Sequence, residues 1–293
     1  MIEKISTSHL RALACPIVLG AAFLLTIAAP LSAQQREYVQ AELVADVQTI
    51  EPGKPFRLGL LFKLPPHAHI YWRFPGSSGL PTSIEWTLPE GFTVGKLQWP
   101  GPERFDIEEI DDVTYGYESE VLLFANVTPP ATFNSSVPVT LAADASWLVC
   151  LESGLCIPEF KSPHREFAVG EARPSNDAAV FTRYASHVPV PLTEAVPVSL
   201  SVSDGRAGAL SFEARAPWRF ALGENDPPAR FSPRKGGPWD LSIEVGGREG
   251  GAATLKFQCS AERPGQIAGV AALPMENSTS GEKRTFYIFL NPS

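Results

Sequence analysis

The chain has 293 residues, with 24 Lys and Arg against 32 Asp and Glu, so its formal net charge is -8. Apolar residues make up 44% and charged residues 19%, a balance that excludes a disordered chain. An acidic sequence without a Lys/Arg block argues against nucleic-acid binding, because the phosphate backbone needs concentrated positive charge. The 28 prolines and 23 glycines favour short strands and turns over long helices.

The first 33 residues have the layout of a secretory signal peptide. Lys4 and Arg11 give a positive start, residues 12–29 carry no charge, and Ala33 is a small residue suited to signal-peptidase cleavage. A membrane anchor is the alternative, because the uncharged run reaches the lower limit for a membrane span. We predict export and cleavage near Ala33, and we expect no later membrane-spanning segment.

From residue 34 onward, the sequence predicts short β-strands separated by turns. Along the first strand, apolar residues alternate with polar ones at Val39, Ala41, Leu43, Ala45 and Val47. Further strands are expected at residues 56–62, 84–88, 121–127, 137–142 and 146–149. Turn signals rich in Pro and Gly lie between them, a spacing typical of an antiparallel β-sandwich.

A domain boundary is expected after about Gly170. Residues 171–191 are more polar and hold one short helix, near residues 178–186. Strands resume at residues 198–202, 209–214, 239–245, 253–259 and 285–290. The predicted fold class is therefore all-β, with a signal peptide (1–33), a β-sandwich domain (34–170), a linker (171–191) and a second β-sandwich domain (192–293).

Three cysteines remain after cleavage, namely Cys150, Cys156 and Cys259. The first two flank a turn in the segment SWLVCLESGLCIPE, so hairpin ends should bring them within the roughly 4.4–6.8 Å between Cα atoms that a disulfide needs. Nearby cysteines usually pair in an oxidising compartment. Spacing alone leaves open a structural staple, worth on the order of 2–3 kcal/mol, or a redox-active pair. Cys259 is expected to be a small buried apolar residue.

Four segments resemble the N-terminal domain of the thiol:disulfide interchange protein DsbD family. They are residues 147–159, HIYWRFPGSSGLPTSIEWTLPEGF from His69, LQWPGPERF from Leu97 and VTYGYESEVLL from Val113. The resemblance spans about residues 37–170, and residues 192–293 more weakly resemble the second β domain of longer members. It implies immunoglobulin-like folding, a periplasmic location and electron transfer through a C-x5-C pair, here Cys150 and Cys156, of the kind connected with cytochrome c biogenesis.

The resemblance also implies a cap loop that shields the cysteine pair. Tyr115 and Gly116 match this loop, with Asp112 and Tyr117 beside them. Ordinary core packing is the alternative for the two tyrosines. A carboxylate such as Asp112 would disfavour a thiolate, so neutralising it should speed alkylation of the reduced protein.

The sequence contains neither the multi-helix membrane domain nor the thioredoxin-like domain of full-length DsbD. A separate thioredoxin-like redox protein, a membrane electron transporter or both are therefore the expected partners, and no cofactor is expected. By the resemblance, Cys156 forms the mixed disulfide and Cys150 resolves it. We predict an enzyme of the protein-disulfide reductase type; the alternative is a non-catalytic β-sandwich binding module with a structural disulfide.

Two weaker candidates remain. His67 and His69 are two residues apart on a predicted strand and could bind copper or zinc, but no third ligand is evident, which favours a structural role. The tryptophans could line a sugar-binding face, although aromatic residues of a sandwich more often pack in its core. These residues are Trp72, Trp86, Trp99 and Trp147.

Overall fold

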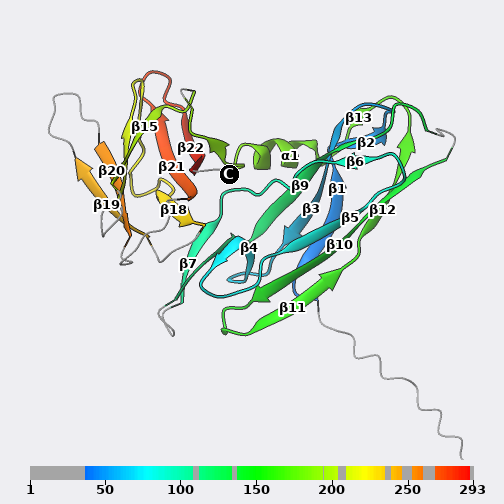
Figure 1. The fold of residues 1–293 in the computed structure, drawn as a ribbon, viewed down its shortest axis with the longest axis horizontal. Coiled ribbons are helices and arrows are strands. Elements are labelled where there is room, and N and C mark those ends of the chain that lie inside the picture. Colours follow the sequence, from blue (N-terminus) through cyan, green and yellow to red (C-terminus); the bar gives the residue numbers. More distant parts are fainter. Residues whose placement is uncertain are drawn as a thin grey trace, which may run out of the picture. The chain divides into compact units, whose positions relative to one another are not determined.

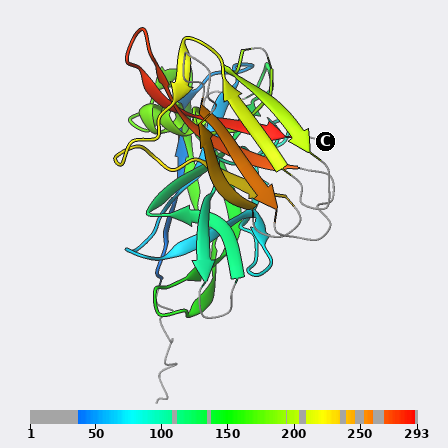
Figure 2. The ribbon, with the colours of Figure 1, turned by 90° about the vertical axis from the view of Figure 1, so that its left-hand side faces the viewer.

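The computed structural model describes residues 37–107, 112–133, 137–193, 195–203, 209–234, 239–245, 253–259 and 268–290. These residues belong to one compact unit, Glu37–Ser293. Within them the chain is built from strands and one short helix, α1 (Ala178–Ala185), which confirms the predicted all-β class (Figures 1 and 2). The predicted signal peptide lies outside the described residues.

Two sheets are formed by residues 40–174. The smaller sheet contains β1 (Gln40–Ala45), β3 (Phe56–Lys63), β6 (Thr93–Val94) and β9 (Glu120–Thr128), in the order β1-β3-β9-β6. The larger sheet contains β2 (Val47–Ile50), β4 (His69–Gly76), β5 (Ser83–Thr87), β7 (Glu103–Ile107), β8 (Asp112–Glu118), β10 (Val139–Cys150), β11 (Cys156–Lys161), β12 (His164–Val169) and β13 (Arg173–Pro174). Its order is β13-β2-β12-β10-β4-β8-β7, with β5 and β11 also paired to β10.

The inner faces of these two sheets enclose a hydrophobic core. Leu58, Leu60 and Phe62 alternate along β3 and are fully buried, as the period-two pattern predicts. The rings of Phe62 and Trp147 meet edge to face, with centroids 5.1 Å apart, and so join the two sheets. Each such side chain contributes about 1.5–3 kcal/mol by leaving water, so this core stabilises the strands that carry the cysteines.

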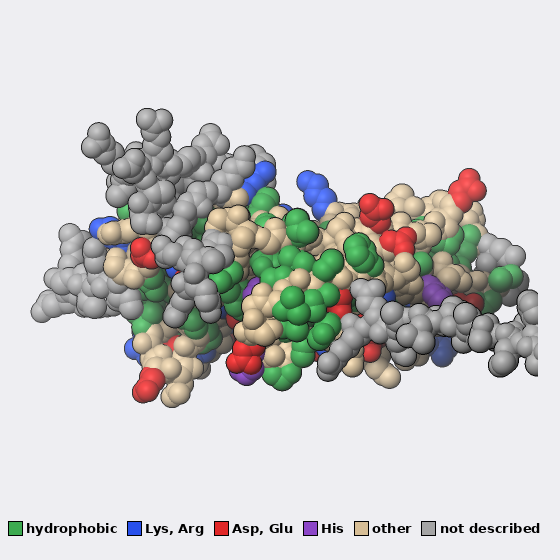
Figure 3. Space-filling model, turned by 90° about the horizontal axis from the view of Figure 1, so that it is seen from below, with side chains coloured by type: hydrophobic (Ala, Val, Ile, Leu, Met, Phe, Trp, Pro, Cys, Tyr) green, Lys and Arg blue, Asp and Glu red, His purple; other side chains and the backbone are tan. Residues whose placement is uncertain are grey.

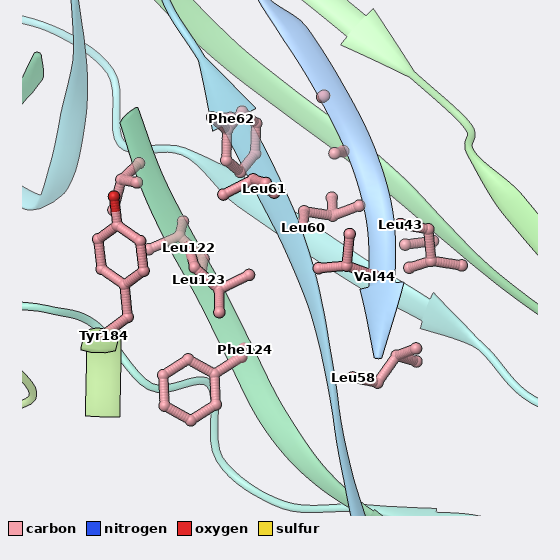
Figure 4. Close-up of a cluster of buried hydrophobic side chains, with 14 of the residues drawn as sticks. Leu43, Val44, Leu58, Leu60, Leu61, Phe62, Leu122, Leu123, Phe124 and Tyr184 are labelled. Carbon is pink, nitrogen blue, oxygen red and sulfur yellow. The ribbon is translucent and has the colours of Figure 1, made fainter. Parts of the chain in front are cut away.

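Helix α1 covers the outer face of the smaller sheet. The ring centroids of Phe181 and Phe124 lie 5.8 Å apart, and the Tyr184 hydroxyl donates a hydrogen bond to the backbone oxygen of Glu120 at 2.7 Å. Figure 4 shows Tyr184 reaching from the helix towards β9, beside Leu122. This second layer explains why β3 and β9 are buried on both faces instead of alternating.

The first predicted strand is in fact two strands that belong to different sheets. β1 ends at Ala45 in the smaller sheet, and β2 begins at Val47 in the larger one. Asp46 lies between them and accepts hydrogen bonds from the backbone N–H and the Nε of Arg57, at 2.8 and 2.7 Å. The prediction of one continuous strand through Val47 is wrong. The bend at Asp46 depends on Arg57 of another strand, which the local pattern does not show.

Residues 190–290 form two further sheets. One contains β14 (Val190–Pro191), β17 (Trp218–Phe220), β18 (Arg230–Pro233), β21 (Gly269–Asn277) and β22 (Lys283–Leu290). The other contains β15 (Val198–Ser203), β16 (Ala209–Ala214), β19 (Trp239–Val245) and β20 (Ala253–Cys259). A second buried cluster, which includes Phe212, Phe257 and Leu273, lies among these strands. The domain boundaries remain predictions.

No helix among the described residues is long and apolar enough to cross a membrane.

Candidate redox site

The two cysteines close a β-hairpin. β10 and β11 pair antiparallel with Cys150 opposite Cys156, and a disulfide joins them with Cα atoms 4.0 Å apart. This distance lies just below the range expected from sequence. In the connecting loop the N–H of Leu151 donates to the oxygen of Leu155 at 2.9 Å, and Gly154 adopts φ 80°, which glycine tolerates without strain. The hairpin disulfide that the spacing predicted is therefore present.

The two sulfurs of this disulfide differ in accessibility. Cys150 is only 3% exposed, whereas Cys156 is exposed to solvent. Thiol–disulfide exchange begins when a thiolate attacks one sulfur of the disulfide, so the attacked sulfur must be reachable. The structure offers Cys156 for this attack and leaves Cys150 as the sulfur that departs.

Cys150 lies on the face of the larger sheet that points away from the core, which we call the outer face. Successive side chains of a strand alternate between faces, and the neighbouring Val149 belongs to the core cluster. Across β4, His69 is the direct partner of Cys150, and Tyr71 lies two residues further along that strand on the same face. The burial of Cys150 therefore comes from side chains of the outer face.

Tyr71 makes the closest polar contact to the buried sulfur. Its hydroxyl lies 3.1 Å from the Sγ of Cys150, and it must be the donor because a disulfide sulfur carries no proton. Tyr71 is 2% exposed and is covered by the loop after β4. Gly79 passes so close that a Cβ there would lie 2.3 Å from the tyrosine ring, and Thr82 Oγ1 donates to the Tyr71 backbone oxygen at 3.0 Å. The loop thus holds the hydroxyl against the sulfur.

His69 completes the cover over Cys150. Its ring stacks on Phe105 of β7 at 4.5 Å and meets the edge of Tyr71 at 5.2 Å between centroids. Burial lowers the pKa of the His69 imidazole below its usual 6.5, because removing water disfavours the charged form. Its Nε2 is buried and has no hydrogen-bond partner within the described part of the chain. The imidazole opposite Cys150 therefore favours its neutral form more than a solvent-exposed histidine does.

The residues matched to the family cap loop lie in strand β8. Tyr115 and Tyr117 are 2% and 4% exposed and belong to the core cluster, which is the packing alternative raised from the sequence. The Tyr117 hydroxyl donates to the backbone oxygen of Pro100 at 2.8 Å, and burial raises the pKa of this phenol well above its usual value. A Cβ at Gly116 would lie 2.1 Å from the Ile70 oxygen, so a side chain there would separate β8 from β4.

The capping of the disulfide by this segment stays a prediction. The side chain of Asp112 lies outside the described residues. In the structure Cys150 lies against Tyr71 and opposite His69, and the His69 ring stacks on Phe105. Of Tyr71, His69 and Phe105, the sequence analysis singled out only His69, and for another role. Tyr71 and Phe105 lie inside the HIYWR and PERF motifs quoted from the sequence, but nothing local indicates that Tyr71 would contact Cys150 or that Phe105 would stack on His69.

A buried carboxylate anchors the hairpin from its inner side. Glu159 of β11 is 4% exposed and accepts hydrogen bonds from the N–H groups of Tyr38 and Val39, at 2.6 and 3.2 Å, and from the indole of Trp147 at 2.9 Å. Buried carboxylates are tolerated when several donors satisfy them. The sequence analysis missed Glu159, although a charged residue at an inward position of a strand is a readable signal.

The weaker sequence candidates have different outcomes. The prediction that His67 and His69 share a strand face is wrong, because Pro65 and Pro66 force a turn in which His67 takes φ 59° before β4 begins. Within the described residues there is no cluster of three metal-ligating side chains. The four tryptophans pack in or against the core, as the preferred interpretation expected. The side chain of Cys259 lies outside the described residues.

The segment that forms this sandwich and its hairpin disulfide is similar to a known family. Residues 35–165 match the family model described as thiol:disulfide interchange protein DsbD, N-terminal, which confirms the resemblance over that segment. No curated protein matches the chain.

A solved structure with a similar fold is the N-terminal periplasmic domain of ScsB from Proteus mirabilis. The match has a TM-score of 0.58 and 18% identity, and it covers 89% of this chain and 96% of that one. At this identity the match shows a shared fold. Because it covers most of the chain, the likeness in fold extends beyond residues 35–165.

Proposed function

We propose that this protein is a periplasmic thiol:disulfide exchange protein that passes electrons between a thioredoxin-like donor and partner proteins through Cys150 and Cys156. The observation that carries the proposal is the asymmetry of the disulfide. Cys156 is open to an incoming thiolate, while Cys150 is covered and accepts a hydrogen bond from Tyr71. The family match over residues 35–165 supports the same chemistry.

The exchange proceeds in two balanced steps. The thiolate of a reduced partner attacks the Sγ of Cys156; a new S–S bond forms between them, and the electron pair of the broken bond leaves on Cys150 as a thiolate. The Tyr71 hydroxyl is placed to donate to that thiolate. The partner's second thiolate then attacks the sulfur of the partner's first cysteine in the mixed disulfide. A disulfide forms within the partner, and Cys156 leaves as a thiolate.

The reduced protein passes its electrons on by the reverse route. The Cys156 thiolate attacks the disulfide of an acceptor protein, and Cys150 then attacks the Cys156 sulfur and releases the reduced acceptor. We propose a separate thioredoxin-like protein, a membrane electron transporter or both as partners. The proposed exchange domain is residues 34–170, joined by a linker (171–191) to a second β-sandwich domain (192–293).

Trapping a mixed disulfide tests the proposal. The Cys150→Ser variant leaves Cys156 free to react but removes the resolving thiol. The trap is a thioredoxin whose resolving cysteine is serine and whose remaining cysteine carries thionitrobenzoate in a mixed disulfide. The Cys156 thiolate should attack the thioredoxin sulfur, release the thionitrobenzoate anion and accumulate as a covalent complex with thioredoxin. The Cys156→Ser variant is the matched control and should react far more slowly, because Cys150 is 3% exposed. If neither variant forms a complex while both remain folded, the disulfide is structural and the protein is a non-catalytic binding module.

The reduction potential separates the same alternatives without a variant. Equilibration with dithiol buffers should give a value in the range of known exchange proteins, roughly -270 to -120 mV. A potential well below about -300 mV would mark a structural bond that cellular donors seldom open.

A further inference from the structure

Strand β11, which begins at the exposed Cys156, is an edge strand. Within the described residues its only pairing partner is β10, and Figure 1 shows it at the margin of the larger sheet. An edge strand presents unpaired backbone N–H and C=O groups, which makes it a template for another extended segment. The reactive sulfur therefore stands at the start of an open backbone edge.

The register shows which backbone groups point outward. Opposed residues of an antiparallel pair alternate between hydrogen-bonded pairs, about 5.5 Å between Cα atoms, and non-hydrogen-bonded pairs, about 4.5 Å. Cys150 and Cys156 lie 4.0 Å apart, so they form a non-hydrogen-bonded pair. The same holds two and four residues further on, at Pro158 and Phe160, which oppose residues 148 and 146. At these three positions of β11 the backbone groups point away from β10.

Proline at position 158 agrees with this assignment. Proline has no N–H, so within sheets it occurs where the missing donor would have faced solvent. Along the outward edge, Cys156 and Phe160 thus each offer a donor and an acceptor, and Pro158 offers an acceptor only. The side chains of the same three residues are exposed, and Phe160 is 75% exposed. Figure 3, which views the molecule from below Figure 1, shows a group of hydrophobic side chains near the middle of that face.

We propose that the outward edge of β11, from Cys156 to Phe160, binds an extended backbone segment of the thiol-bearing partner beside that partner's reactive cysteine. This inference rests on the proposed exchange function and specifies how the partner docks. Strand addition supplies backbone hydrogen bonds without demanding a particular sequence, which suits a protein that meets a donor and several acceptors. The exposed Phe160 ring adds apolar contact at the far end of the edge.

A second copy of this chain fits the edge less well. An antiparallel pairing of two β11 edges that uses all three outward positions places Pro158 opposite Pro158. Neither residue has an N–H, so the central pair would make no backbone hydrogen bond. A partner segment with an ordinary residue at that position donates to the Pro158 oxygen and avoids this loss.

Amide hydrogen exchange on the trapped complex tests the proposal. The probe is the Cys150→Ser chain joined through Cys156 to a thioredoxin whose resolving cysteine is serine. The amides of Cys156 and Phe160 should exchange at least tenfold more slowly in the complex than in the free variant. The amides of Ile157 and Glu159 face β10 and serve as internal controls, because they should be protected in both states.

The outcomes distinguish this inference from the function on which it rests. A mixed disulfide in which the Cys156 and Phe160 amides exchange as fast as in the free chain overturns strand addition and leaves exchange intact. Failure to form any mixed disulfide overturns both. Protection that appears without thioredoxin and grows with protein concentration assigns the edge to a second copy and also overturns the proposal.

A pair of variants gives an independent kinetic test. Phe160→Pro removes the outward N–H and the ring, whereas Phe160→Ala removes the ring only. The rate of reduction by thioredoxin, divided by the rate with the small dithiol dithiothreitol, should fall about five- to tenfold further in F160P than in F160A. Equal ratios for the two variants would show that the backbone of Phe160 plays no part in docking.

Discussion

The hydroxyl of Tyr71 should set the reactivity of the buried cysteine. Tyr71→Phe removes one oxygen and keeps the ring that packs beneath Gly79. In the folded oxidised protein this oxygen donates to the Cys150 sulfur at 3.1 Å, and in the exchange reaction the same sulfur becomes a thiolate. The variant therefore removes a donor at the atom on which negative charge develops.

The size of the effect follows from the strength of a hydrogen bond to a charged group. Such a bond is worth about 1.5–3 kcal/mol, and a change of one pKa unit corresponds to about 1.36 kcal/mol. The pKa of the Cys150 thiol should therefore rise by roughly one to two in Y71F. If half of this stabilisation is present in the transition state, reduction by thioredoxin slows about three- to tenfold.

Two assays measure these quantities. The pH dependence of alkylation in a Cys156→Ser background reports the pKa of the Cys150 thiol, and stopped-flow mixing with reduced thioredoxin reports the rate. Tyr184→Phe is the control, because its hydroxyl is bound to Glu120 on the other sheet. The reasoning is refuted if Y71F and Y184F give the same Cys150 pKa and the same reduction rate as the parent protein.

Three further predictions concern stability. Glu159→Ala removes the acceptor of three hydrogen bonds, two of them from buried donors, and should lower the free energy of unfolding by about 2–5 kcal/mol in urea titrations. A loss below about 1 kcal/mol would contradict the anchoring role. Gly79→Ala places a methyl group 2.3 Å from the Tyr71 ring at a residue with φ 90°. It should lower the free energy of unfolding by at least about 1–3 kcal/mol and speed alkylation of reduced Cys150. Unchanged alkylation would show that the loop does not hold the tyrosine in place. Burial lowers the pKa of His69 and His187 below 6.5, so below that pH the unfolded chain binds more protons than the folded protein. The free energy of unfolding should therefore fall as pH drops through 6.5, and it should level off below the pKa values of the folded state. The same pH dependence in a variant with glutamine at both positions would exclude these histidines as its cause.

Local sequence pattern was sufficient for most of the strands. The predicted strands at residues 209–214, 239–245 and 253–259 match β16, β19 and β20, and the predicted helix matches α1 within one residue. Period-two alternation and turn residues act over a few positions, so they can be read without the fold. The bend at Asp46 could not be read in this way, because it depends on Arg57 of the neighbouring strand.

In the candidate site, too, the local contacts could be predicted from the sequence and the contacts between distant strands could not. Six positions separate Cys150 from Cys156, and a short turn joins them, so their pairing follows from the chain itself. Which of the two cysteines is covered depends on Tyr71 and His69, which come from another strand, β4. The sequence by itself determined the hairpin and its disulfide, because these contacts are local. Only the tertiary structure decided that Cys150 is buried and Cys156 open, because the register of distant strands brings the covering side chains to one sulfur and leaves the other at a sheet edge.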